Sequence, residues 1–310
     1  MIIDSHVHLW AKKYYGDAFK PTSSEGRDIS YASGFPDVDF DVLIQDYKKW
    51  GFDKIVALAQ LTERIAKGSM ATSEFVAEFQ NKYPDKVIGL GSTEPLDDRG
   101  RFSKAGFEHF EKAIKEYKLK GMMWSPGYGY WYPNEKSVYP FYQLAVELDV
   151  PLYYHMATWW PPAANHPLRY GRLYHLDDVI IDFPDLKISI EHMGFPWTDE
   201  LIALMGRSKN VYTDVSMILP RPQGYRDISL RGPITITSKL VQMKEFGVLD
   251  RVMYGSDYFW DPEGLQPHKE VEFIKEGLNA TAERCGWPTF SYQEIEGILG
   301  KNAMRLFELQ

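Results

Sequence analysis

Histidines and one aspartate stand at the ends of short apolar runs, where metal ligands are expected in a chain of alternating strands and helices. His6 and His8 close the run IDSHVH, and residues i and i+2 of a β-strand point to the same face. His155 follows VPLYY, His192 follows LKISIE, and Asp257 follows RVMYGS. Imidazole nitrogens with one carboxylate suit Zn²⁺ or another borderline divalent ion, with one position left open for water. These residue types and positions predict a metal centre.

Eight β-branched or apolar runs, each followed by a helix-length amphipathic stretch, must position these side chains. Helical patterns such as DVLIQDYKKWG and FEHFEKAIKEY separate the runs, and several of them close with Gly or Pro. This rhythm predicts an α/β fold, a single (β/α)8 TIM barrel domain over residues 1–310, in which the carboxyl ends of the strands carry the chemistry. An open doubly wound sheet would need a glycine-rich phosphate turn after the first strand, and the sequence has none. The runs lie at 2–8, 54–60, 86–92, 119–124, 150–156, 186–193, 210–216 and 251–257.

Two segments without periodicity, at about 10–40 and 216–235, are expected to be loop insertions over the C-terminal mouth of the barrel. The loops after the fourth and fifth strands are rich in aromatic residues, which suit a flat or ring-shaped substrate, although they could also pack the loops onto the barrel. The expected lining residues are Trp124, Trp131, Trp159 and Trp160. Loop arginines could pair with a substrate carboxylate or merely face solvent, and the candidates are Arg169, Arg172 and Arg221.

The composition narrows the class of partner. The formal net charge is -8, with 43 acidic against 35 basic residues and no basic run, which argues against nucleic acid or an anionic membrane as the main partner. A small-molecule substrate is the expected partner. The single cysteine, Cys285, excludes an internal disulfide framework, and the first strand begins too early to leave room for a signal peptide. We therefore expect a cytoplasmic protein.

The chain resembles the amidohydrolase superfamily, in the branch related to aminocarboxymuconate semialdehyde decarboxylase and its metal-dependent hydrolase relatives. The resemblance runs nearly end to end and rests on IDSHVH, YPFYQLAVELDVPLYYH, DDVIIDFPDLKISIEHMGFPW, NVYTDVS, YGSDYFW and ILGKNAMRLF. It implies a barrel fold, a catalytic role for His192 and a homodimer. It also implies one divalent metal, Zn²⁺ with Mn²⁺ as the alternative, held by His6, His8, His155 and Asp257.

Two features depart from the relatives. The fourth strand has Met122 and Met123 where binuclear members carry a bridging lysine, so a second bridged metal is not expected. The sequence His155-Met156-Ala157 lacks the proline that follows this histidine in the decarboxylases, which weighs against decarboxylation.

The expected function is that of a hydrolase which uses metal-bound hydroxide on a lactone, an amide or an activated carbon-carbon bond of a cyclic or aromatic acid. His192, with an ordinary pKa of about 6.5, would manage the proton, and its alternative role is that of a fifth ligand. Asp257 would hold the metal and accept a proton from the attacking water. Glu191 is expected to point to the other face of its strand and pack against a helix. The alternatives are a non-oxidative decarboxylase of an aromatic or muconate-like acid and a barrel that binds metal or ligand without turnover.

Overall fold

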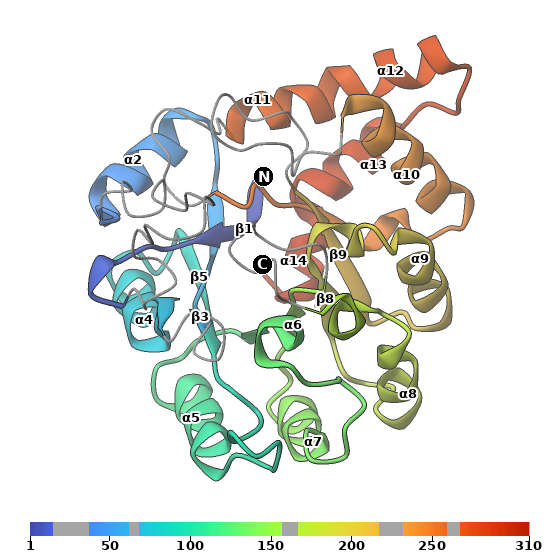
Figure 1. Ribbon diagram of the computed structural model, residues 1–310. Coiled ribbons are helices and arrows are strands. Elements are labelled where there is room, and N and C mark those ends of the chain that lie inside the picture. The colour runs from blue at the N-terminus through green and yellow to red at the C-terminus, as the bar shows by residue number, and fades with distance from the viewer. Residues whose placement is uncertain (15–36, 62–67, 157–166, 217–231, 259–266, 310) are drawn as a thin grey trace, which may run out of the picture.

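Eight parallel strands form the centre of the protein, and helices surround them (Figure 1). The computed structural model describes residues 1–14, 37–61, 68–156, 167–216, 232–258 and 267–309. The strands pair in the order β1-β2-β5-β6-β7-β8-β9-β10. Each falls within one of the eight predicted runs, which confirms the prediction of a (β/α)8 barrel. Their bounds are β1 Ile3–His8, β2 Lys54–Leu58, β5 Val87–Ser92, β6 Met122–Trp124, β7 Leu152–Tyr154, β8 Ile188–Ile190, β9 Val211–Val215 and β10 Val252–Tyr254.

The barrel closes between β1 and the residues that follow β10. Val7 and Tyr258 form a parallel bridge, and the backbone N–H of His8 donates to the carbonyl of Tyr258 at 2.8 Å. The N–H of Asp257 donates to the carbonyl of His6 at 2.9 Å. These bonds place the first predicted ligand pair beside the last predicted ligand.

The buried carboxylate of Asp4 reinforces this closure. Its Oδ1 accepts from the backbone N–H groups of Ser256 at 2.9 Å and His6 at 3.1 Å, and its Oδ2 accepts from the hydroxyl of Tyr47 at 2.8 Å. One side chain therefore joins β1, the end of β10 and helix α2 (Phe40–Lys49).

The helices begin where polar side chains cap their first turns. Asp39 accepts from the N–H groups of Asp41 and Val42, and Thr72 and Ser103 cap the next two main helices in the same way. The remaining helices are α4 Ser73–Lys82, α5 Lys104–Lys115, α6 Pro126–Gly129, α7 Tyr139–Glu147, α8 His175–Asp182, α9 Thr198–Arg207, α10 Pro233–Glu245, α11 Pro267–Glu272, α12 Leu278–Cys285, α13 Tyr292–Glu296 and α14 Asn302–Leu306.

Shorter elements complete the described chain. A small antiparallel pair, β3 (Gln60–Leu61) and β4 (Ser69–Ala71), follows β2. The 3-10 helices are η1 Lys12–Tyr14, η4 Leu168–Gly171, η5 Glu191–Gly194 and η6 Leu249–Arg251, and the π-helical turns are η7 Phe273–Gly277 and η8 Gly297–Lys301.

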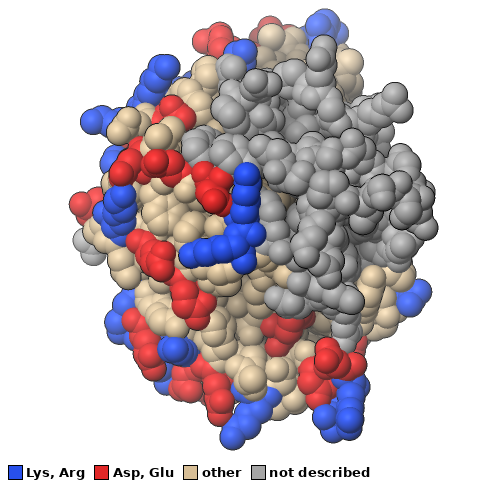
Figure 2. Space-filling model, turned by 60° about the vertical axis from the view of Figure 1, so that its left-hand side comes forward, with Lys and Arg blue, Asp and Glu red and all other residues tan. Residues whose placement is uncertain are grey.

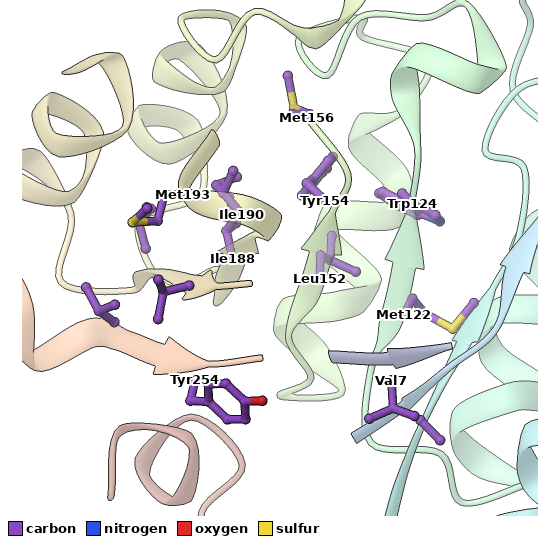
Figure 3. Packing of buried hydrophobic residues seen from close by; sticks show 14 of the residues in the cluster. Val7, Met122, Trp124, Leu152, Tyr154, Met156, Ile188, Ile190, Met193 and Tyr254 are labelled. Atoms are coloured by element: carbon purple, nitrogen blue, oxygen red, sulfur yellow. The ribbon is translucent and has the colours of Figure 1, made fainter. Parts of the chain in front are cut away.

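Two apolar layers lie on the two faces of the barrel wall. Met122 and Trp124 of β6 belong to the layer between strands and helices, whereas Met123 belongs to the interior layer. Figure 3 shows the helix-side layer, to which Leu152 and Tyr154 also contribute. Successive side chains of a strand thus enter the two layers in turn, as expected for a strand that is buried on both faces. Polar groups are therefore found at the strand ends.

The predicted insertions at 10–40 and 216–235 lie largely outside the described residues. Within the second, α10 already begins at Pro233. Among the described residues, no helix is both long enough and apolar enough to cross a membrane. On the face drawn in Figure 2, acidic and basic side chains are interspersed.

Candidate metal centre

Three side-chain atoms converge where β1 meets the end of β10. The Nε2 atoms of His6 and His8 lie 3.1 Å apart, so the two rings share one face as predicted. Asp257 Oδ1 lies 3.5 Å from the Nε2 of His6 and 3.3 Å from that of His8. We call these three atoms the ligand triangle. Ligand atoms placed about 2.1 Å from one tetrahedral ion lie roughly 3.4 Å from one another, so the triangle fits a single divalent ion.

Asp214, on β9, contacts the imidazole ring of His6. Its Oδ2 lies 3.1 Å from Nδ1 of His6, and its Oδ1 accepts from the backbone N–H of His192 at 3.1 Å. The side chain is fully buried. A carboxylate on the far nitrogen of a metal-binding histidine fixes the ring and raises its basicity, so Asp214 would orient His6 to bind a metal through Nε2.

His192 lies beside the triangle, in η5 directly after β8. A ligand atom of His192 lies within 4.8 Å of those of His6 and Asp257. Its Nδ1 is 2.6 Å from Oγ of Ser216, which follows β9. The ring is therefore held close to the candidate metal position, as the sequence predicts for a proton carrier or a further ligand.

His155 follows β7 and belongs to a second group, formed with Glu191 and His192 within 4.8 Å. Its Nδ1 lies 2.9 Å from Oε2 of Glu191, and its Nε2 lies 3.3 Å from the hydroxyl of Tyr128. The Tyr128 ring stacks on the imidazole at 5.2 Å between centroids. His192 is common to this group and to the group that it forms with His6 and Asp257.

The prediction for Glu191 is wrong. The residue does not point to the helix side but is fully buried, with Oε2 3.9 Å from Nε2 of His6. The reason is that β8 ends at Ile190, after which His192 and Met193 take left-handed φ values of 58° and 51°. The two-residue alternation of a strand therefore cannot be extended to position 191.

Left-handed backbone also marks Asp257, whose φ is 55°. Non-glycine residues adopt this region at a cost of about 1 kcal/mol or more, and such strain is concentrated at functional sites. Nearby, a Cβ at Gly255 would lie 2.7 Å from the Cβ of His6, so only glycine permits this close approach.

The electrostatics favour a cation. Burial lowers the pKa of His6, but the carboxylates of Glu191 and Asp214 outweigh it and raise that pKa to about 10. Burial would raise the pKa of Asp257, yet its hydrogen bond with His8 and the neighbouring imidazoles hold it below its ordinary value. Burial lowers the pKa of His8 itself. The pocket thus stabilises positive charge placed among these carboxylates.

The structure corrects the assignment of two tryptophans to the substrate pocket. Trp124 and Trp131 are each 1% exposed, and their rings lie 5.8 Å apart in the helix-side layer. Trp124 packs there against Phe110 of α5 and Phe141 of α7. The other predicted lining tryptophans, Trp159 and Trp160, lie outside the described residues.

Of the three predicted arginines, the structure describes two. Arg172 bonds the carboxylate of Glu200 on α9, so it is engaged in an ion pair within the protein. Arg169 is exposed, and its guanidinium carbon lies 4.7 Å from the centre of the Tyr170 ring. Arg221 lies outside the described residues. Neither described arginine has a contact with the ligand triangle.

Sequence reasoning missed Asp214, Ser216 and Tyr128, and it gave Glu191 no role in the site. The run NVYTDVS carried a usable signal, because Asp214 and Ser216 are polar residues at the carboxyl end of a buried strand. That is the criterion that selected the predicted ligands. Tyr128 had no such signal, since α6, which carries it, is only four residues long.

Comparison with known proteins places this chain in a family. The family model described as Amidohydrolase matches residues 3–309. A search of curated proteins found no match. Among solved structures, an uncharacterised TIM-barrel protein from Bordetella bronchiseptica is 20% identical, with 99% of this chain and 98% of that chain covered and a TM-score of 0.67.

Two further structures have the same fold. A 5-carboxyvanillate decarboxylase from Novosphingobium aromaticivorans, solved with manganese, is 17% identical, with 100% and 97% of the chains covered and a TM-score of 0.67. A protein from Acinetobacter baumannii described as a probable 2-pyrone-4,6-dicarboxylic acid hydrolase is 17% identical, with 99% of each chain covered and a TM-score of 0.60. Since the family model covers nearly the whole chain, the protein belongs to the amidohydrolase family, whose enzymes depend on a divalent metal.

Proposed function

We propose that this enzyme is a metal-dependent hydrolase of a cyclic or aromatic carboxylic acid derivative, with a lactone, an amide or an activated carbon-carbon bond as the bond cleaved. The ligand triangle carries the proposal, because its spacing fits one divalent ion at the active end of a barrel of this family. His155 would be the fourth ligand, and Zn²⁺ is the expected ion with Mn²⁺ as the alternative. When bound, such an ion lowers the pKa of a coordinated water to about 7 and polarises a substrate oxygen.

His192 is the residue we assign to proton transfer. The Nδ1 atom of His192 is hydrogen-bonded to Ser216, and the backbone N–H of His192 donates to Asp214, which fixes the start of η5. Proton transfer is therefore assigned to Nε2, on the side of the ring away from Ser216. Asp257, besides holding the ion, would accept a proton from the attacking water.

A decarboxylase is the second candidate. The observation in its favour is that a decarboxylase of an aromatic acid, solved with manganese, shares the fold over 97% of its length. Both reactions need an ion beside a proton-carrying group, so the ligand triangle supports either one. The residue after His155 is Met156 instead of the proline of the decarboxylases, and for this reason we favour hydrolysis.

Oxygen-18 labelling separates the two reactions. The metal-loaded enzyme is incubated in ¹⁸O-water with 2-pyrone-4,6-dicarboxylate and, separately, with 5-carboxyvanillate, and the organic products and released CO₂ are analysed by mass spectrometry. A hydrolase must place one water oxygen in the ring-opened product, and we expect that label. Release of CO₂ from 5-carboxyvanillate, with no label in the organic product, would contradict hydrolysis and favour the second candidate.

The remaining features of the protein are predictions. We expect a small-molecule substrate, a homodimer and a cytoplasmic location. Of the predicted pocket residues that the structure describes, Arg169 is the one we retain as a candidate for a substrate carboxylate.

A further inference from the structure

Glu191 is a fully buried acid, and only one of its two oxygens has a hydrogen-bond partner among the residues that the structure describes. Its Oε2 is bonded to Nδ1 of His155 at 2.9 Å and lies 3.9 Å from Nε2 of His6. Its Oε1 is buried and has no hydrogen-bond partner within the described part of the chain. A buried carboxylate with an unmet oxygen destabilises a fold, so its presence beside the ligand triangle indicates a role in binding.

The register of two adjacent strands brings Glu191 to His155. Tyr154 of β7 pairs with Ile190 of β8, and each is the last residue of its strand. The next residues, His155 and Glu191, are therefore neighbours at the same rim. The contact between them follows from the barrel itself and does not depend on a long loop.

The contact fixes which nitrogen of His155 carries the hydrogen. An ionised carboxylate only accepts hydrogen bonds, so Nδ1 is the donor and the lone pair of the neutral ring is on Nε2. The hydroxyl of Tyr128 lies 3.3 Å from that Nε2, which is longer than the roughly 2.8 Å of a well-formed bond from a hydroxyl. Such a weak contact can give way to a metal ion.

We propose that Glu191 is a positioning residue of the metal centre, which holds His155 in the tautomer that presents Nε2 to the ion. The proposal rests on the proposed function, because it requires His155 to be a ligand. A carboxylate on the far nitrogen of a metal-bound histidine orients the ring and raises its basicity, and its removal weakens metal binding by about 10- to 100-fold. Glu191 would thus act on His155 as Asp214 acts on His6.

The test measures Zn²⁺ affinity of the full-length protein by competition with a chelator. We expect Glu191→Gln, which retains an acceptor but no charge, to weaken binding about 10-fold, and Glu191→Ala to weaken it about 100-fold. Glu270→Gln is the matched control, because Glu270, on α11, is also fully buried and accepts a hydrogen bond from the Tyr254 hydroxyl at 3.0 Å. Its affinity should equal that of the wild type.

A second comparison shows whether Glu191 acts through His155. In a His155→Ala background, Glu191→Gln should cause no further loss of affinity, since the residue on which it acts is gone. The melting temperature of Glu191→Gln is compared with that of the wild type without metal and with Zn²⁺. The rise in melting temperature on adding Zn²⁺ should be smaller than in the wild type.

Three results would overturn the role. Wild-type affinity in Glu191→Gln would overturn it, as would an equal loss in the presence and absence of His155. A lower melting temperature of the metal-free variant with an unchanged response to Zn²⁺ would show a purely structural residue. If the wild-type chain itself binds no stoichiometric metal, the proposed function fails first, and this outcome is distinct from the other three.

Discussion

Replacing Gly255 by alanine tests whether the closure of the barrel positions the metal ligands. A Cβ at this position would lie 2.7 Å from the Cβ of His6 and 3.2 Å from the Cβ of Asp214. Ordinary van der Waals contact begins at 3.4 Å, so the end of β10 and strand β1 must separate by about 0.7 Å. His6 and Asp257 lie on the two sides of this contact, and the change acts directly on the ligand triangle.

Two consequences follow for Gly255→Ala. Overpacking of a filled interior costs about 1–3 kcal/mol, and we expect this loss in the free energy of unfolding of the metal-free protein. Metal ligands tolerate displacements of only about 0.2 Å, so a separation several times larger should weaken Zn²⁺ binding at least 10-fold, or about 1.4 kcal/mol.

Urea denaturation in EDTA measures the first quantity, and chelator competition measures the second. Gly206→Ala is the control, because Gly206 lies in α9 and a Cβ there meets no atom within 4 Å. That change should stabilise the protein by up to about 1 kcal/mol and leave Zn²⁺ affinity unchanged. Wild-type stability and affinity in Gly255→Ala would refute the reasoning, since His6 could then be positioned without the close contact.

Three further predictions concern the same site. Each of His6→Ala, His155→Ala and Asp257→Ala should lose stoichiometric metal in elemental analysis, and full retention in two of the three would refute the ligand assignment. His192→Asn should keep its metal but lose about 10² to 10⁴ in turnover, whereas loss of metal would make His192 a ligand. Burial raises the pKa of Asp4 from 3.8 to about 6, so its protonated form stabilises the fold below pH 3.8 and this stabilisation disappears as the pH rises through 6. We therefore expect the free energy of unfolding of Asp4→Asn, measured by urea denaturation in EDTA, to rise relative to that of the wild type by up to about 3 kcal/mol between about pH 4 and pH 7. A difference between the two proteins that does not change with pH would contradict this.

The sequence sufficed for the barrel because each strand is an uninterrupted apolar run followed by a helical pattern. It also sufficed for the convergence of His6, His8 and Asp257, since the closure of a barrel brings its first and last strands together. His155 was expected in the same cluster. The structure shows it beside Glu191 and His192 instead, and its place among the metal ligands is a prediction that the variants above test.

Two errors concern the face to which a side chain points. Glu191 was assigned to the helix side by strand alternation, but the strand ends one residue earlier and the chain turns through left-handed conformations. Trp124 was assigned to the substrate pocket, but it is the last residue of β6 and its ring faces the helices. Both faces of a barrel strand are apolar, so composition alone does not indicate which face a tryptophan occupies.

The same loss of regularity produces the site. His192 and Asp257 each stand where the backbone leaves the strand with a positive φ, and their side chains are thereby directed toward the rim. Asp214 and Glu191 are buried beside them without enough positive charge from the described residues nearby, as the raised pKa of His6 indicates. A fold that keeps such carboxylates buried is less stable than one with apolar residues in their place, and an ion bound as we propose in the ligand triangle would offset that cost. The proposed metal site would therefore account for the acids around the histidines, which the stability of the barrel does not explain.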